Sequence, residues 1–321
     1  MDALSEVLRA VRLAGAVILH ADLGAPWGLD VPSATPLAKG FLHDADHPAI
    51  FHAVLRGECW MQMDEDEPLR VTEGEVLLFS HGDAHRLVSD PGSATVPLAS
   101  LVRPPVAGEL LTIVHGGDGE RVRLVTGLAA VDRRLGDPLL VDLPRVMRVD
   151  LRGQHSVGQL ENSLAFSLTE TDAPRPGGIA SLERIAELVV IDAIRRHVES
   201  TPPGATGWLA GLDDRFVGRA LALLHGSPGE DWTVERLAKL VGVSRSALAE
   251  HFTRIIGEPP ITYLTRWRLC LAARELSGSM REIQGIAKDA GYDSAGAFSA
   301  AFKRAYGKTP TAWRKKQTRR K

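Results

Sequence analysis

The stretch WTVERLAKLVGVSRSALAEHFTRIIGEPP, residues 232–260, is followed by a second stretch of the same pattern, EIQGIAKDAGYDSAGAFSAAFKRAYGKTP, residues 282–310. Leu237 matches Ile286, 49 residues later, and past the turn the distance between matching residues becomes 50. The matches at the longer distance are Leu248 with Phe298, Phe252 with Phe302, Arg254 with Arg304, Gly257 with Gly307, Pro260 with Pro310 and Tyr263 with Trp313. The one inserted residue falls in a Gly-containing turn, where a structural repeat tolerates it. This part of the chain therefore contains a duplicated structural unit.

Each copy has the pattern of a helix, a tight turn and a second helix. In the first copy, Val234, Leu237 and Val241 recur at helical spacing. Gly242 suits a left-handed helix end because it has no Cβ, and Ser244 supplies a side-chain oxygen for the next helix N-terminus. That next helix has an apolar face and then helix-ending residues: Leu248, Phe252, Ile255, Gly257, Pro259 and Pro260.

Two helices joined by a short turn form either an ordinary helical hairpin or a helix-turn-helix, whose second helix enters the DNA major groove, about 12 Å wide. The charge distribution favours the second interpretation. Residues 213–321 hold 20 Lys and Arg against 11 Asp and Glu, whereas residues 1–212 hold 18 against 29. A basic segment beside an acidic partner domain is typical of proteins that bind polyanions. The basic tail at 314–321 is either a solvated end or a further phosphate contact.

This part of the chain resembles the DNA-binding domain of AraC/XylS-type transcriptional regulators, in which one long helix joins two helix-turn-helix units. The family's signature for the second unit is present as Ile286-Ala287, Gly291-Tyr292, Ser294, Phe298, Phe302-Lys303-Arg304, Gly307, Thr309-Pro310 and Trp313-Arg314. The expected domain is all-α and covers residues 212–321. We expect a leading helix from Asp213 to His225 and a bridging helix from Ile261 to Leu276.

In regulators of this type, the residues two and six positions before the second helix's core phenylalanine tend to face base edges. These residues are Glu250 and Ser246 in the first unit, but Ala300 and Gly296 in the second. A glutamate accepts a hydrogen bond from cytosine N4, whereas alanine touches only a thymine methyl and glycine makes no specific contact. The predicted DNA contacts are Ser244, Arg245, Ser246, Ala249, Glu250 and Arg254 in the first unit, and Ser294, Ala295, Gly296, Ser299, Lys303 and Arg304 in the second. The first unit is therefore predicted to specify the site, and the second to position the protein on the DNA backbone.

The 321 residues have the length and composition of a globular protein with two domains, because 24% are charged and 44% are hydrophobic. Residues 1–20 are predicted to form a short helix that packs on the adjoining part of the N-terminal domain. Their apolar run, Ala14–Leu19, is too short for a membrane span or a signal peptide, so we expect no membrane partner. Two cysteines, Cys59 and Cys270, cannot form a disulfide framework, and a reducing cytoplasm is the expected location.

Between about residues 17 and 149, short apolar runs alternate with Gly, Pro and Asp. Many short strands separated by turns favour an antiparallel sandwich or barrel. Two segments, Phe51–Trp60 and Glu73–Leu87, resemble the paired motifs of the cupin jelly roll, and in particular the cupin-type sensor domain often fused to AraC-type domains. The predicted fold class is therefore α+β, with an N-terminal cupin-like β jelly roll or barrel, a helical dimerisation segment and a C-terminal all-α domain.

The cupin resemblance places His52 and His85 together in a barrel mouth, where imidazoles suit zinc, copper, iron or nickel. A divalent or copper-type metal is the cofactor that such a site would hold, and Trp60 joins the two histidines as a candidate effector contact. The usual set of three histidines and a carboxylate is incomplete, because the first motif lacks its HxH and Glu. Further candidate ligands without a diagnostic spacing are His43, His47, His81 and His115. The alternative is that His52 and His85 are satisfied core or rim histidines.

An oxidant is a second candidate effector, because some regulators with this type of sensor respond through cysteines. A reactive thiol is partly exposed and has a depressed pKa, whereas Cys59 lies in an apolar strand. Relatives of this kind often have a Cys-Gly pair where this sequence has Thr126-Gly127, so the obvious disulfide partner is missing. A buried structural thiol is the favoured interpretation.

The segment from Ile179 to Ser200 is predicted to be a helix with one broad apolar face: Leu182, Ile185, Ala186, Val189, Val190, Ala193, Ile194 and Val198. It resembles the dimerising helix of such regulators, and the alternative is that it packs on its own sensor domain. Residues 201–211, which begin with prolines and glycines, are the predicted linker. The predicted domains are thus a sensor and dimerisation domain at 1–200, helical from about 150, and the DNA-binding domain.

Three classes of function compete. A sequence-specific, effector-responsive transcriptional regulator accounts for the duplicated unit, the basic half and the linker. A cupin-type metal-dependent enzyme accounts only for the motifs around His52 and His85, and an architectural DNA binder without an effector does not need a sensor domain. We therefore predict a dimeric cytoplasmic regulator without enzymatic activity, and expect an activator, although the sequence does not separate activation from repression. Its predicted partners are promoter DNA, RNA polymerase and a small-molecule, metal or oxidant effector.

Overall fold

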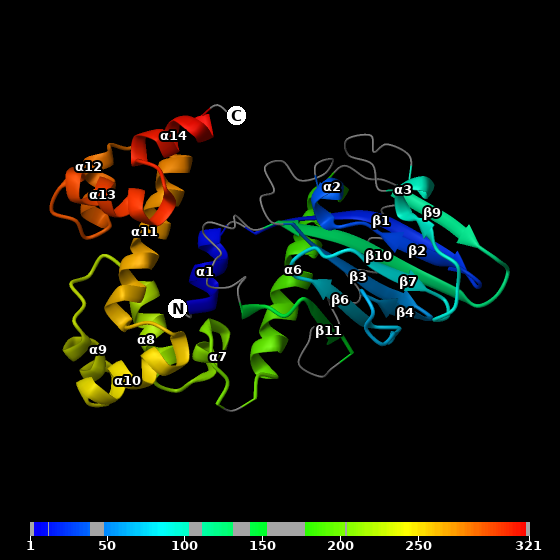
Figure 1. Ribbon diagram of the computed structural model, residues 1–321, viewed down its shortest axis with the longest axis horizontal. Helices are drawn as coiled ribbons and strands as arrows, with labels where there is room; N and C mark the ends of the chain where they lie inside the picture. The colour runs from blue at the N-terminus through cyan, green and yellow to red at the C-terminus, as the bar shows by residue number, and fades with distance from the viewer. Residues whose placement is uncertain are drawn as a thin grey trace. The chain divides into compact units, whose positions relative to one another are not determined.

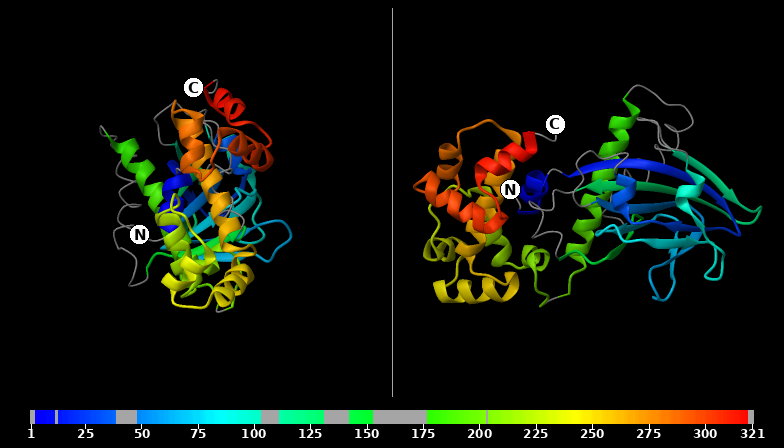
Figure 2. Two further views of the ribbon diagram at one scale, coloured as in Figure 1. Left: turned by 90° about the vertical axis from the view of Figure 1, so that its left-hand side faces the viewer. Right: turned by 45° about the horizontal axis from the view of Figure 1, so that its top comes forward.

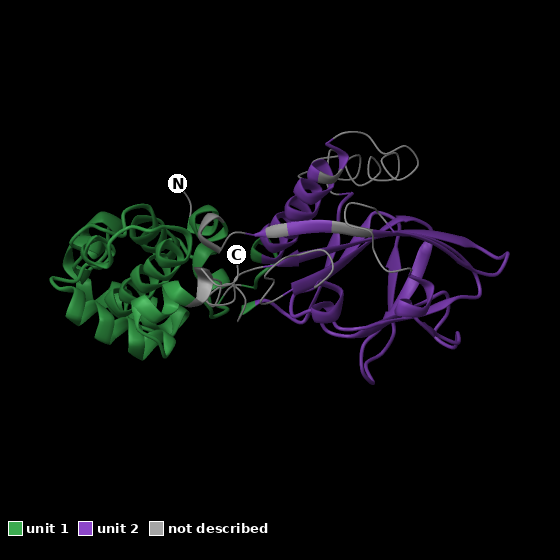
Figure 3. Ribbon diagram, turned by 90° about the horizontal axis from the view of Figure 1, so that it is seen from above, with its two compact units in different colours: residues 1–12, 133–142, 198–321 green, residues 13–132, 143–197 purple. Residues whose placement is uncertain are grey.

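The computed structural model describes residues 3–11, 13–38, 48–102, 111–130, 142–152, 177–202 and 204–318. Its contacts divide the chain into two compact units, which Figure 3 colours separately. Unit 1 contains residues 1–12, 133–142 and 198–321, and unit 2 contains residues 13–132 and 143–197. Four predicted features lie wholly or partly outside the described residues: His43, His47, the start of the helical part at 153–176 and the end of the basic tail.

Unit 2 is built from two β sheets (Figures 1 and 2). In the part of the chain that the structure describes, a six-stranded sheet has the order β11-β6-β3-β10-β1-β9, and a five-stranded sheet has the order β5-β4-β7-β2-β8. The strands are β1 Ala14–Gly24, β2 Gly28–Val31, β3 Pro48–Arg56, β4 Glu58–Gln62, β5 Leu69–Thr72, β6 Glu75–Phe79, β7 His85–Val88, β8 Val96–Pro97, β9 Leu111–Gly116, β10 Arg121–Ala130 and β11 Val146–Asp150, with short helices α2 Ala34–Ala38 and α3 Leu98–Leu101. Apart from the parallel pairs β1–β9 and β2–β8, the strand pairs are antiparallel. The predicted cupin-like β domain is confirmed.

The main core of unit 2 lies between the two sheets, because side chains alternate between the faces of each strand. In β4, Cys59 is buried in this core, whereas the next residue, Trp60, is half-buried on the opposite face. The six-stranded sheet is covered on both faces. On β10, Leu124 belongs to the core between the sheets, and Val125, on the other face, is equally buried.

Helix α6, Gly178–Glu199, contributes to the cover on this second face. A Cβ placed on Gly15 of β1 would lie 2.8 Å from the Cβ of Ala186, so helix and strand touch. The apolar face predicted to dimerise is buried within the single chain at Leu182, Ile185, Ala186, Val189, Val190, Ala193 and Ile194. These residues of α6 are therefore covered by the chain itself, as expected if the helix packs on its own sensor domain. Leu188, 52% exposed, is an apolar side chain that α6 leaves at its surface.

Unit 1 is helical in its described residues, and Figure 1 shows α11 running from α8–α10 to α12–α14. The helices are α1 Ala3–Val11, α7 Trp208–Asp213, α8 Val217–Gly226, α9 Val234–Val241, α10 Arg245–Ile256, α11 Pro260–Gly278, α12 Ile283–Asp289, α13 Ala295–Tyr306 and α14 Pro310–Thr318. Both predicted helix-turn-helix units and the bridging helix are present. None of the described helices is long and apolar enough to cross a bilayer.

Two expectations for the helices differ from the structure. The N-terminal helix ends at Val11, and residues 14–24 form β1 between β10 and β9, a long-range pairing that local spacing does not reveal. Helix α1 contacts α8, and both belong to unit 1. The predicted leading helix, Asp213–His225, corresponds to α8, which begins only at Val217. It is preceded by a separate helix, α7, which begins at Trp208, inside the predicted linker, where Asp142 accepts the Trp208 backbone N–H.

The helices on either side of the turn in each helix-turn-helix unit are capped as the sequence pattern requires. Ser244 and Ser294 occupy corresponding N-caps, and their side-chain oxygens accept the N–H groups of Ala247 and Ala297, each at 3.2 Å. Gly242 ends α9 with a φ of 88°, a left-handed conformation that strains residues with a Cβ. These caps set the direction in which each second helix leaves its turn.

Candidate nucleic-acid interface

The second helix of the first unit, α10, has one buried and one exposed face. The buried face consists of Leu248, Phe252 and Ile255. The residues predicted to contact DNA lie on the other side: Ser244, Arg245, Ser246, Glu250 and Arg254 are exposed and Ala249 is half-buried. An α helix anchored on one side with polar residues on the other is suited to insertion into a major groove.

Arg245 forms an ion pair that the sequence pattern did not predict. Its Nε donates to a carboxylate oxygen of Glu235 on α9 at 2.7 Å, and both side chains are exposed. An exposed pair of this kind stabilises the protein by at most about 1 kcal/mol, so a DNA phosphate or base competes with it easily.

Arg254 is linked to two residues that are not among the predicted DNA contacts. Its Nη2 donates to Nδ1 of His251, 2.9 Å away, and Nε2 of His251 donates to Oδ2 of Asp214, also at 2.9 Å. The other oxygen of Asp214 accepts the N–H groups of Phe216 and Val217 at the start of α8. The three side chains link the leading helix to the exposed face of α10.

The second helix of the second unit, α13, offers less to read bases with. Gly296 is exposed, and a Cβ built on it would meet only the Ser294 hydroxyl, at 3.9 Å. Ala295 and Ser299 are half-buried. The exposed cations of this helix, Lys303 and Arg304, lie in its last turn. This surface carries charge for phosphates, with few groups that distinguish bases.

A buried polar cluster connects helices α7, α8 and α11, which support the first helix-turn-helix unit. The hydroxyl of Tyr263 on α11 accepts a hydrogen bond from the Trp208 indole at 2.7 Å and lies 2.6 Å from Nε2 of His225 on α8. Burial, with a smaller contribution from Arg266, lowers the pKa of His225 from 6.5 to about 3. Burial likewise raises the pKa of Tyr263. The cluster is therefore uncharged and ties α7, α8 and α11 together.

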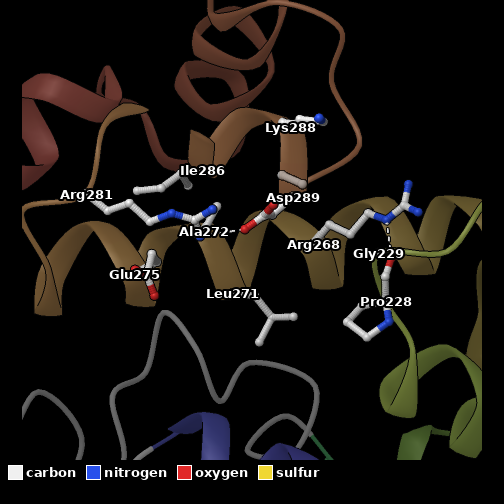
Figure 4. Close-up of a pocket in the computed structure, with 11 residues that line it drawn as sticks. Pro228, Gly229, Arg268, Leu271, Ala272, Glu275, Arg281, Ile286, Lys288 and Asp289 are labelled. Carbon is white, nitrogen blue, oxygen red and sulfur yellow. Dashed lines mark hydrogen bonds and ion pairs between the residues drawn. The ribbon is translucent and has the colours of Figure 1, made fainter. Parts of the chain in front are cut away.

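A pocket of about 450 Å³ lies beside α11, between α12 and the loop before α9 (Figure 4). Two arginines that line it are engaged by the chain. Arg268 donates to the carbonyl oxygens of Pro228 at 2.6 Å and Glu230 at 2.8 Å, and Arg281 pairs with Asp289 at 2.5 Å. The contacts of Arg268 fasten the bridging helix to the loop before α9, and the Arg281–Asp289 pair joins the segment after α11 to α12. Both arginines therefore have a structural role.

In unit 2, the structure brings His52 and His85 together. Their Nε2 atoms are 2.8 Å apart, while Nδ1 of His52 is 2.8 Å from the Thr126 hydroxyl and Nδ1 of His85 is 2.9 Å from the Asp83 carbonyl oxygen. Because a carbonyl only accepts, Nδ1 of His85 carries its proton and Nε2 accepts one from His52. The Thr126 hydroxyl then donates to Nδ1 of His52. With both histidines neutral, each of their ring nitrogens has a hydrogen-bond partner.

Burial holds the histidine pair neutral. It lowers the pKa of His52 well below 6.5, with His85 adding to the effect, and it lowers the pKa of His85 to about 4. The ring of Phe79 stacks on His85 with 3.6 Å between the ring centroids. His85 nonetheless lines a pocket of about 470 Å³, together with Gln62, Asp64 and other residues, so the pair lies close to an opening.

The pair offers two ligands for a metal and fixed outer partners, Thr126 and Asp83, which would orient the two rings. In the described part of the chain, no third His, Cys, Asp or Glu completes a cluster. His81 is instead 3.1 Å from the Leu143 carbonyl oxygen. The donor set therefore fits a metal only in part.

Two other residues of the sensor domain, the candidate effector contact Trp60 and the expected structural thiol Cys59, lie elsewhere. Trp60 lines a separate hollow, with Glu58 and Arg70, and is not brought together with the histidines. Cys59 is buried, and burial raises the pKa of its thiol to about 12, with Glu58 and Glu75 adding to the effect. A thiol of this kind is inert, in agreement with a structural role.

Comparisons with known proteins agree with both halves of this description. A family model described as a cupin matches residues 2–199, and one described as a helix-turn-helix domain matches residues 237–316. An AraC-like transcription regulator from Streptomyces lividans is 36% identical over 280 residues, 86% of this chain and 89% of that protein. Another, from Streptomyces antibioticus, is 32% identical over 316 residues, 98% of this chain and 99% of that protein. Among solved structures, an AraC-type regulator from Chromobacterium violaceum is similar at 27% sequence identity and a TM-score of 0.32. The match covers 34% of this chain and 96% of that one.

A cupin-like domain followed by two helix-turn-helix units defines a transcriptional regulator that binds double-stranded DNA. The chain belongs to the AraC family of these regulators.

Proposed function

We propose that this regulator recognises its operator mainly through α10, while α13 anchors the protein to the phosphate backbone. One observation carries the proposal: at corresponding positions α10 exposes Ser246 and Glu250, whereas α13 exposes Gly296 and Ala300. A carboxylate discriminates cytosine from the other bases in the major groove, and neither glycine nor alanine forms a hydrogen bond there. The site should therefore contain one informative block and one weakly specified block.

Binding-site selection from a random DNA pool tests this proposal. Glu250→Ala should change the preferred base at one or two positions of the informative block, at a cost of about 1–3 kcal/mol per base pair in the original site. Lys303→Ala is the matched control in α13, and it should weaken binding to all sequences alike because it removes a phosphate contact. Two equally informative blocks for the wild-type protein would refute the proposal.

The remaining parts of the function are proposed on family grounds and on the features above. The protein would act as a cytoplasmic homodimer that recruits RNA polymerase and activates transcription, without catalysis of its own. A dimer contact on α6 would involve its exposed side, where Leu188 lies. The alternative of a cupin-type enzyme is weaker, because His52 and His85 supply two ligands and no third completes a cluster among the residues that the structure describes.

The effector site is proposed at His52 and His85. The pocket beside His85 gives a ligand a route to the pair, and the two rings have defined outer partners. The Nε2 atoms of His52 and His85 would be the ligands of a divalent or copper-type metal. His52 would then carry its proton on Nδ1, where the Thr126 hydroxyl can accept it. A small organic effector would instead fill the pocket. An oxidant is the least supported effector, because Cys59 is buried.

A further inference from the structure

The two helix-turn-helix units place an arginine at the same position of their second helices, Arg254 in α10 and Arg304 in α13. Arg254 lies one helical turn beyond Glu250, on the same side of α10. When Glu250 faces bases in a groove, Arg254 is at the edge of that groove, where the phosphates lie. In the first unit only, residue 251 is a histidine, and the corresponding residue in the second unit is Ala301.

The arrangement around His251 fixes its ring completely. Because a guanidinium only donates, Nδ1 of His251 accepts from Arg254, which requires that its proton be on Nε2. This proton is donated to Asp214, whose other oxygen is occupied by capping α8. The ring edge of His251 also meets Phe216, with the two rings inclined at 75° and their centroids 6.2 Å apart.

We propose that His251 is a positioning residue for DNA binding: oriented by Asp214, it holds the Arg254 guanidinium in place for one operator phosphate. The inference rests on the proposed role of α10, which it deepens. An arginine side chain that is mobile on the protein surface loses rotamer entropy when it binds a phosphate. A side chain that is already oriented by a hydrogen-bond acceptor loses less of this entropy. Only one N–H of Arg254 is used by His251, so the others remain available to phosphate oxygens.

A double-mutant cycle on the full-length protein tests the proposal, with a labelled duplex of the site selected by the wild-type protein as probe. His251→Ala should weaken binding about three- to tenfold, because the Arg254 side chain must then lose its rotamer freedom when it binds DNA. Arg254→Ala should weaken binding and reduce the salt dependence by about one phosphate contact. In the His251→Ala background, Arg254→Ala should cost at least about threefold less than in the wild type, because the positioned contact is already lost.

The second unit provides the matched control. Arg304→Ala should have the same effect with or without His251, because Ala301 provides no such acceptor. His251→Gln should restore most of the affinity, since its amide also offers an oxygen that accepts from Arg254 and N–H groups that donate to Asp214. Urea unfolding of each variant shows whether a change in affinity reflects lost stability.

The proposal is overturned if the effects of His251→Ala and Arg254→Ala are additive, or if Arg254→Ala leaves affinity unchanged. It is equally overturned if His251→Ala couples to Arg304 as strongly as to Arg254, because a general loss of structure would do this. None of these results alters the base preference tested by Glu250→Ala, so a failure here is distinguishable from failure of the proposed function.

Discussion

Replacing Tyr263 by Phe tests whether the buried cluster of α7, α8 and α11 holds the DNA-binding unit together. The hydroxyl is hydrogen-bonded to the Trp208 indole and lies 2.6 Å from His225 Nε2. Removing it leaves two buried polar atoms without a partner, each at a cost of about 1–3 kcal/mol. Nδ1 of His225 already lacks one among the described residues, so the histidine cannot compensate by turning over. We expect a loss of about 2–4 kcal/mol in the free energy of unfolding of unit 1.

Hydrogen exchange of the full-length protein, measured by mass spectrometry on peptides from α8 and α11, reports this loss as faster exchange. Tyr292→Phe is the control, because Tyr292 is half-buried and its hydroxyl has no comparable cluster among the described residues. This control should change stability by less than about 0.5 kcal/mol. Equal exchange in Tyr263→Phe and the wild-type protein would show that the hydroxyl does not hold these helices together.

Three further predictions concern pH, metal binding and assembly. The pKa of His225 is about 3 when folded and 6.5 when unfolded, so between these pH values only the unfolded state takes up a proton. The free energy of unfolding should therefore fall by about 1.4 kcal/mol per pH unit below pH 6.5. In His225→Gln this pH dependence, measured by hydrogen exchange of α8, should be weaker. If the histidine pair binds metal, His52→Ala or His85→Ala should lower the metal content of the purified protein without changing its affinity for non-specific DNA, and a metal-free wild type prepared without chelators would contradict this. Leu188→Arg should convert a dimer to a monomer in light scattering, whereas Val114→Arg, on the exposed side of β9, should not; a dimer that survives Leu188→Arg would exclude this side of α6.

The DNA-binding unit was predictable from the sequence because its signals are local. Helical spacing around Leu237, the serine caps and the glycine ends lie within a few residues of one another, and duplication repeated the evidence. The exposure of Glu250 also followed from the position of Phe252 on the same helix. The boundary at residues 201–211 was less accurate, because α7 depends on Asp142, more than sixty residues earlier.

The β unit was predictable only as a class. Short apolar runs between turn residues identified β4 and β6, but β1 was mistaken for a continuation of the first helix, since its partners β9 and β10 are about a hundred residues away. The broad apolar face of α6 is compatible with a partner subunit or with the protein's own sheet. The structure buries most of that face within the chain and places Ala186 against Gly15 of β1. Sequence also placed His52 and His85 together correctly, but gave no sign that Trp60 faces away from them.

The sequence by itself determined the two helix-turn-helix units, the cupin-like class of the N-terminal half and the unequal chemistry of the two recognition helices. These properties depend on residue types at short, regular spacings, and side chains at such spacings share a face wherever the element packs. Only the tertiary structure revealed the links between Asp214, His251 and Arg254, between Trp208, Tyr263 and His225, and between Thr126, His52 and His85. Each joins elements distant in the chain through hydrogen bonds that require placement within a few tenths of an ångström, and no local pattern encodes such placement.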